Sequence, residues 1–213
     1  MSVPDTLASI RAALAAKPVL IFLAGPNGSG KSTFYDEYLQ RLELPYVNAD
    51  RIALILRAAD PTAALDVVNR RAFTEAEALR LALVEAGLSF CTETVFSDPV
   101  GAKLTFLEDA RARGFTVFLV FIGLDNVVLG VARVKHRADH GGHDIPDEKL
   151  YARFPRTLAN LRAAIPLVDE AWLLDNSSYD TPYRVVAVYR GSQLVSHHPP
   201  LPHWMQELPG LGG

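Results

Sequence analysis

Residues 19–33 have the sequence VLIFLAGPNGSGKST, and this stretch decides the fold. Its first six residues are apolar or small and are too few for a core helix, so they predict a buried strand. Residues 25–32 match the spacing G-x-x-x-x-G-K-[ST], and Phe34, Tyr38 and Leu42 follow at helical spacing. A strand, a glycine loop and a helix in this order are the context that a nucleotide phosphate-binding loop requires.

The chemistry of phosphate binding explains the spacing of this loop. Glycine allows backbone turns that other residues disfavour, so that successive N–H groups can point at a polyphosphate. The N-terminal end of the following helix adds positive field. Lys31 is expected to reach the β- and γ-phosphates, and the Ser32 hydroxyl is expected to ligate Mg²⁺. The residues predicted to bind nucleotide are Gly25, Pro26, Asn27, Gly28, Ser29, Gly30, Lys31, Ser32 and Thr33.

Composition favours a single α/β domain over residues 1–213. Hydrophobic residues make up 49% of the chain and charged residues 21%, as in soluble globular proteins. The net charge of −3 makes nucleic acid an unlikely partner. Cys91 is the only cysteine, no apolar run is long enough to cross a membrane, and Asp5 stands where a signal peptide is basic. We therefore expect a cytoplasmic protein that does not bind membranes.

Strand and helix signals alternate along the chain. They predict a P-loop NTPase fold with three α/β/α layers, a mostly parallel five-stranded sheet and a helical lid. The other expected strands cover 44–48, 88–94, 115–122 and 171–175. The expected helices cover 2–16 within an N-terminal segment 1–17, then 32–42, 51–56, 62–85, 99–113, 125–137 and 147–161.

Several finer expectations accompany this assignment. Asp98 is the candidate N-cap of helix 99–113. Residues 183–189 and 193–196 predict a C-terminal hairpin. The tail 197–213 is rich in Pro and Gly, so we expect it to be partly mobile, with Trp204 and Met205 as anchors. The residues expected to face inward on helix 62–85 are Leu65, Val68, Phe73, Ala76, Leu79 and Leu83.

Other features distinguish between the enzyme classes that share a phosphate-binding loop. A GTPase needs a guanine-reading Asn-Lys-x-Asp sequence, which this chain lacks. A motor or transport ATPase has an acidic residue after four apolar ones, whereas the strand at 117–122 is followed by Gly123-Leu124. A small-molecule kinase fits better, because it needs an acceptor base, a substrate pocket and a mobile basic lid.

Two carboxylates lie at the carboxyl ends of the second and third expected strands. Asp50 can orient an acceptor hydroxyl and take its proton, or it can cap a helix that begins at Arg51. Glu93 can hydrogen-bond an acceptor or hold a water on Mg²⁺, or it can be a solvated strand end. The residues predicted to bind the acceptor are Asn48, Asp50, Glu93, Thr94 and His143.

The predicted lid covers residues 133–161. Its arginines have the planar guanidinium groups that suit the spread charge of a phosphoryl transition state, although a solvated salt bridge is the commoner role for any one of them. The lid histidines give a lesser alternative, a zinc site at His136, His140 and His143. The predicted catalytic residues are Lys31 and Asp50, together with Arg133, Arg137, Arg153 and Arg156 of the lid.

As an ordered set, these motifs resemble the small chromosomal branch of the zeta-toxin kinases over roughly residues 18–190. The motifs are residues 24–33, Asn48-Ala-Asp50, Glu93-Thr94, Gly141-Gly-His-Asp-Ile-Pro146, Arg153-Phe-Pro-Arg156, Asn160-Leu161 and Asp175-Asn-Ser177. The resemblance implies phosphorylation of the sugar of UDP-N-acetylglucosamine, with ATP or GTP and Mg²⁺, and so a block of cell-wall synthesis. It also implies an antitoxin protein as a partner.

The resemblance further implies residue roles. Asp50 matches the catalytic base, Glu93-Thr94 the substrate-holding strand end, and Arg133 the first of two γ-phosphate arginines. His143 stands at the position of the second, so one of the other lid arginines is expected to serve. We also expect no extended C-terminal substrate region. Two alternatives therefore stay open: a kinase of another acceptor, such as a nucleoside, an antibiotic or an RNA end, and a nucleotide-dependent switch with little turnover.

Overall fold

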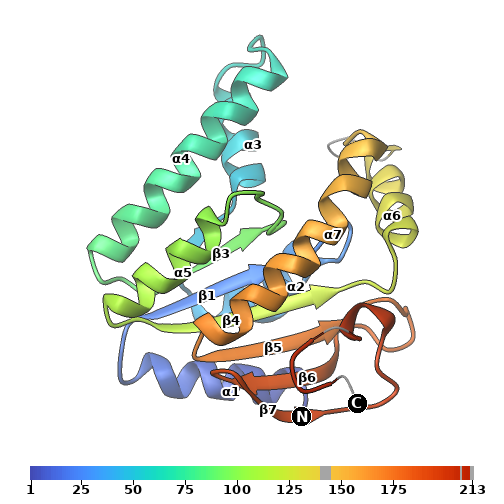
Figure 1. Ribbon diagram of the computed structural model, residues 1–213. Coiled ribbons are helices and arrows are strands. Elements are labelled where there is room, and N and C mark those ends of the chain that lie inside the picture. The colour runs from blue at the N-terminus through green and yellow to red at the C-terminus, as the bar shows by residue number, and fades with distance from the viewer. Residues whose placement is uncertain (140–144, 207, 212–213) are drawn as a thin grey trace.

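The computed structural model describes residues 1–139, 145–206 and 208–211. Within these residues the strands form one seven-stranded sheet of order β2-β3-β1-β4-β5-β6-β7, with helices on both faces (Figure 1). The strands are β1 (Val19–Ala24), β2 (Tyr46–Val47), β3 (Phe90–Thr94), β4 (Thr116–Gly123), β5 (Glu170–Asp175), β6 (Arg184–Arg190) and β7 (Gln193–His197).

The first five strands are parallel, and β6 and β7 extend the sheet as an antiparallel hairpin. The expected α/β class, the parallel arrangement of five strands and the hairpin are confirmed. The sheet is larger than expected, because the hairpin joins its edge by pairing β6 with β5.

The helices also follow the predicted order. They are α1 (Val3–Leu14), α2 (Lys31–Phe34), α3 (Ala49–Ala59), α4 (Leu65–Glu85), α5 (Ala102–Ala112), α6 (Val127–Asp139) and α7 (Asp147–Ala164). The helix after the glycine loop continues from α2 through a π turn, Tyr35–Leu39, and a 3-10 turn, Gln40–Leu42, so it ends where the sequence predicted. Further 3-10 turns cover Ile165–Leu167 and His203–Met205. No helix among the described residues is long and apolar enough to cross a membrane.

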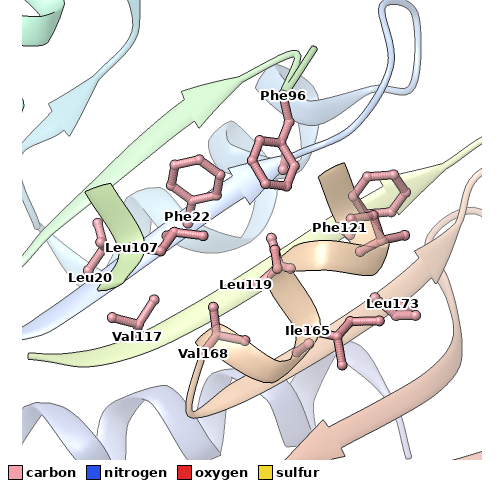
Figure 2. Close-up of a cluster of buried hydrophobic side chains, with 14 of the residues drawn as sticks. Leu20, Phe22, Phe96, Leu107, Val117, Leu119, Phe121, Ile165, Val168 and Leu173 are labelled. Carbon is pink, nitrogen blue, oxygen red and sulfur yellow. The ribbon is translucent and has the colours of Figure 1, made fainter. Parts of the chain in front are cut away.

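The core lies on both faces of the parallel strands, because alternate side chains of a strand point to opposite faces. Leu20 and Phe22 of β1 pack on the face covered by α5 and α7, while Ile21 and Leu23 pack on the face covered by α1 and α2. Figure 2 shows the first of these clusters, with Leu119 of β4 at its centre. Because these five strands run parallel, their carboxyl ends meet at one edge of the sheet.

Two local predictions were wrong. Asp98 is not the N-cap residue of α5, because the chain turns again and Gly101 takes that position, but Asp98 Oδ2 still accepts from the Lys103 N–H in the first turn at 3.5 Å. On α4, Leu65, Phe73 and Leu79 are 48%, 57% and 42% exposed instead of buried. The helix packs mainly along α3 and projects with it beyond the sheet (Figure 1), so its buried stripe is narrower than a sheet-covering helix would need. The buried α4 residues are Val68, Ala72, Ala76, Arg80, Leu83 and Val84.

The C-terminal tail is anchored as expected by Trp204 and Met205, which are both buried. The Trp204 ring covers Gly123 so closely that a Cβ on this glycine would lie 2.3 Å from the ring. Its indole Nε1–H donates to Asp175 Oδ1 at 3.2 Å. The tail therefore closes over the carboxyl ends of β4 and β5.

Candidate active site

The glycine loop joins β1 to α2 at the carboxyl edge of the sheet. Gly28 and Gly30 have positive φ angles of +77° and +91°, in the left-handed region that favours glycine. A Cβ on Gly28 would lie 2.6 Å from the Gly130 carbonyl oxygen, and one on Gly30 would lie 2.7 Å from Asn176 Nδ2. Only glycine fits at these two positions, because the backbone turns left-handed against tightly packed neighbours.

Lys31 is buried at the centre of the loop, with 6% of its surface exposed. Its Nζ donates to the Pro26 carbonyl at 3.0 Å. Burial lowers the pKa of Lys31, and the negative charges of Glu93 and Asp50 oppose that shift. The Lys31 ammonium is thus poorly solvated and lies against the loop backbone, where a bound polyphosphate would supply a counter-charge.

Ser32 and Glu93 meet beside the loop. The Ser32 hydroxyl donates to Glu93 Oε1 at 3.0 Å, and the Tyr46 hydroxyl donates to Glu93 Oε2. Glu93 is therefore held by two donors and is not a solvated strand end. A hydroxyl and a carboxylate next to a phosphate-binding loop are oxygen donors of the kind that Mg²⁺ prefers.

The zinc alternative stays a prediction. Over residues 1–139, 145–206 and 208–211, no three His, Cys, Asp or Glu side chains gather closely enough to hold a metal ion. His140 and His143, two of the three candidate ligands, lie outside the described residues, as does the expected acceptor contact at His143.

Asp50 lies in the first turn of α3. The helix begins at Ala49 instead of Arg51, and Asn48 caps it by accepting from the N–H groups of Asp50 at 2.8 Å and Arg51 at 3.2 Å. Asn48 thus takes the capping role that was the alternative for Asp50. The Asp50 residue is exposed, and among the described residues its carboxylate accepts no side-chain hydrogen bond, so it is available to a ligand.

The four lid arginines lie on two helices, Arg133 and Arg137 on α6 and Arg153 and Arg156 on α7. Arg133 Nη1 donates to the Asn176 carbonyl at 2.9 Å, and its guanidinium lies 5.1 Å from the centre of the Tyr179 ring. Arg133 and Arg137 line an open cavity of about 480 Å³ beside Gly28 and Gly30. Both arginines therefore border the glycine loop on the side of this cavity.

On α7, Arg153 is near enough to Arg156 and Asp50 for their charges to act on it. Arg153 lines a small pocket with Pro26 and Asn27. Burial and then the neighbouring Arg156 lower the pKa of Arg153, whereas Asp50 raises it. Arg156 is exposed and donates to the Ser97 carbonyl at 3.1 Å.

Thr94 is an expected acceptor ligand. Its hydroxyl accepts from the Phe96 N–H at 3.1 Å and shapes the turn after β3.

Asn176 and Tyr183 hold the glycine loop through hydrogen bonds to its backbone carbonyl groups. No function was predicted for either residue from the sequence. Asn176 Nδ2 donates to the Ser29 carbonyl at 2.9 Å, and the Tyr183 hydroxyl donates to the Gly30 carbonyl at 3.0 Å.

The Asn27 side-chain oxygen and the Ser29 hydroxyl are buried without a hydrogen-bond partner among the described residues. Buried polar atoms without partners are costly, so a polar ligand fits this loop.

Arg80 forms a second feature that the sequence analysis missed. It is only 4% exposed although it is charged, and its Nε–H donates to Thr92 Oγ1 at 2.7 Å. Glu77 forms ion pairs with both Arg80 and Lys103. This cluster ties α4 and α5 to β3 just before Glu93, and a lone Arg on an apolar helix face was the only sequence signal for it.

Comparison with known proteins agrees with this geometry. The zeta toxin family model matches residues 5–165. An uncharacterized protein of Haemophilus influenzae is 28% identical over 134 residues, which cover 63% of this chain and 91% of that protein. Family and site together support a nucleotide-dependent phosphotransferase.

Two solved structures share the fold. One chain of the AvrRxo1-ORF1:AvrRxo1-ORF2 complex with sulphate ions has a TM-score of 0.69 at 18% identity and covers 92% of this chain. A chain of the PezAT chromosomal toxin-antitoxin system of Streptococcus pneumoniae has a TM-score of 0.57 at 15% identity, covering 81% of this chain and 76% of its own length. The present chain spans 64% of the AvrRxo1 chain, so the likeness concerns a shared domain.

Proposed function

The chain belongs to the zeta toxin family, and on this premise we propose that it is a kinase that transfers the γ-phosphoryl group of ATP or GTP to a hydroxyl of a small acceptor. A nucleotide sugar such as UDP-N-acetylglucosamine is the first candidate acceptor, and an antitoxin protein is the proposed partner. The observation that carries the proposal is the meeting of Lys31, Ser32 and Glu93 at the loop, with Asp50 exposed in the neighbouring helix.

The loop binds the donor. Its N–H groups and the Lys31 ammonium hold the phosphates, and Arg133 and Arg137 approach them from α6. Ser32 and Glu93 would hold Mg²⁺, which when bound neutralises charge on the phosphates. The residues present fit this ion, since the donors beside the loop are oxygens.

Asp50 acts on the acceptor. As a general base it accepts the proton of the attacking hydroxyl while that oxygen bonds to the γ-phosphorus, the bond from the γ-phosphorus to the β–γ bridging oxygen breaks, and the nucleoside diphosphate leaves. Arg153 carries positive charge near Asp50 and the loop, where it can stabilise the charge that develops on the transferred group. Phosphoryl transfer depends largely on such positioning and electrostatic stabilisation.

The test measures nucleotide consumption with Mg²⁺ across a panel of hydroxyl acceptors, with two variants beside the wild type. Asp50→Asn keeps the side-chain shape and should lower turnover about 10²-fold or more, with nucleotide affinity nearly unchanged. Lys31→Ala should lower both nucleotide affinity and turnover, the latter about 10²–10³-fold.

Two outcomes would contradict the proposal. Unchanged turnover of Asp50→Asn would exclude this carboxylate as the base. Tight nucleotide binding by the wild type, with no acceptor-dependent release of diphosphate, would favour a nucleotide-dependent switch instead.

A further inference from the structure

Tyr46 occupies a constrained position between the two halves of the site. Its hydroxyl donates to Glu93 Oε2 and accepts from Asn48 Nδ2 at 3.0 Å. Its ring stacks on Tyr35, with ring centroids 3.5 Å apart and planes 8° from parallel. The Arg51 guanidinium lies 4.7 Å from the centre of the Tyr46 ring. The ring is thus held by stacking and the hydroxyl by two hydrogen bonds.

These contacts form one continuous hydrogen-bonded chain. Ser32 and Tyr46 each donate to one oxygen of Glu93. The Asn48 amide group donates to Tyr46, and its oxygen accepts from the backbone N–H groups of Asp50 and Arg51. In each of these hydrogen bonds one donor group meets one acceptor group. Connected hydrogen bonds of this kind hold their members more firmly than isolated pairs do. The chain runs from the loop hydroxyl to the first turn of α3.

We propose that Tyr46 is a positioning residue that aligns the Glu93 carboxylate with Ser32 and, through Asn48, fixes the helix turn that carries Asp50. The inference rests on the proposed function, since it assigns Ser32 and Glu93 to a magnesium–nucleotide complex. Tyr46 itself touches no reacting atom. Its effect is on the geometry of Glu93, in the way that outer-sphere partners orient metal ligands in other proteins.

The decisive variant is Tyr46→Phe, which removes the hydroxyl and keeps the stacked ring. The readout is binding of a fluorescent ATP analogue as Mg²⁺ is titrated, which requires no turnover. The variant should need about tenfold more Mg²⁺ for half-maximal binding. Binding in excess EDTA should be unchanged, because the loop itself is intact. Tyr35→Phe makes the same chemical change in the other ring of the stack and should behave as wild type.

Asn48→Ser provides a second, independent variant. Serine still caps a helix well, so α3 should keep its start, but the donor to Tyr46 is lost. The Mg²⁺ requirement should rise in the same direction, by a smaller factor. This variant decides the question if Tyr46→Phe does not fold, which circular dichroism would show.

The outcomes separate this inference from the proposed function. Wild-type Mg²⁺ dependence in both Tyr46→Phe and Asn48→Ser would overturn the positioning role. An equal loss of binding in EDTA and in Mg²⁺ would also overturn it, since that would indicate a general structural role. A wild type that binds no nucleotide at any Mg²⁺ concentration would instead contradict the proposed function.

Discussion

The two sides of the candidate site differ in how they are held. On the donor side, residues 25–33 are braced by hydrogen bonds from Asn176 and Tyr183, and Lys31 is 6% exposed. On the acceptor side, α3 has no buried residue, and Leu54 and Ile55 are each 69% exposed. The phosphate-binding half is therefore built by packing within the chain, whereas α3 of the acceptor half packs along α4 and leaves most of its own surface open.

This difference agrees with the proposed function. A polyphosphate has one shape and charge, so its site can be preformed from backbone N–H groups and glycines. Acceptors vary, and an exposed helix can change its surface residues with little effect on the fold. Specificity for the acceptor is thus expected to reside in α3 and its neighbours, the part of the site with the least internal packing.

The largest effect is expected from Gly28→Ala on the donor side. The new Cβ would lie 2.6 Å from the Gly130 carbonyl oxygen in a left-handed backbone, so the strain and the overlap add. We expect a loss of about 2–4 kcal/mol in the free energy of unfolding and at least about tenfold weaker nucleotide binding. Chemical denaturation and nucleotide titration measure the two effects.

Gly114→Ala is the matched control for this prediction. Gly114 also has a positive φ, of +89°, but an added Cβ there would meet no atom within 4 Å. It should cost only the backbone strain of about 1–2 kcal/mol and leave nucleotide binding unchanged. If both variants behaved alike, the close packing of the loop against Gly130 would not be needed for binding, and the contrast between the two sides would weaken.

Glu77→Gln tests the junction between the two sides, where α4 meets β3. Glu77 is paired with the buried cations Arg80 and Lys103, and its removal leaves both with less compensation. Because the Glu77 side chain is 36% exposed, water limits the cost, and we expect a loss of about 1–2 kcal/mol in the free energy of unfolding. Denaturant titration of both proteins at pH 7 measures this loss.

The pH dependence of this variant has a defined sign. Burial lowers the pKa of Lys103 below its ordinary value of 10.5, and Glu77 opposes that shift. Without Glu77 the folded-state pKa falls further, so the unfolded chain binds more protons and stability rises as pH increases toward 10.5. The deficit of the variant should therefore shrink at alkaline pH. Glu75→Gln, which removes an exposed pair with Arg71, should change stability by less than about 0.5 kcal/mol at every pH.

The parts that the sequence predicted are those with a local signal. The glycine loop is a contiguous motif, and the positions of Asp50 and Glu93 followed from strands that end at one edge of a sheet. Asn176 was missed as a loop brace because its partner, Ser29, lies 147 positions away, and Tyr46 was missed because its role depends on contact with Glu93. A side-chain pair between distant segments leaves no periodic pattern in a sequence.

The exposed residues of α4 show a second limit. Apolar side chains at helical spacing predicted an inward face that included Phe73 and Leu79, but the helix lies against α3 and projects beyond the sheet. Periodicity reports that a helix has an apolar stripe. It does not report how much of that stripe a partner element covers, and here the partner is a short helix with no buried residue.

The smallest effect is expected from Ile55→Ala on α3. Ile55 is 69% exposed, so the substitution removes little buried surface, and alanine has the higher helix propensity. The free energy of unfolding should change by less than about 0.5 kcal/mol, and the KM for nucleotide should stay at the wild-type value. Leu54→Ala, at the neighbouring and equally exposed position, serves as a replicate.

A loss of about 2 kcal/mol or more in the free energy of unfolding is the cost of truncating a buried Ile, and it would mean that α3 is packed as firmly as the loop. The acceptor side would then be as rigid as the donor side, and specificity would have to come from a fixed surface.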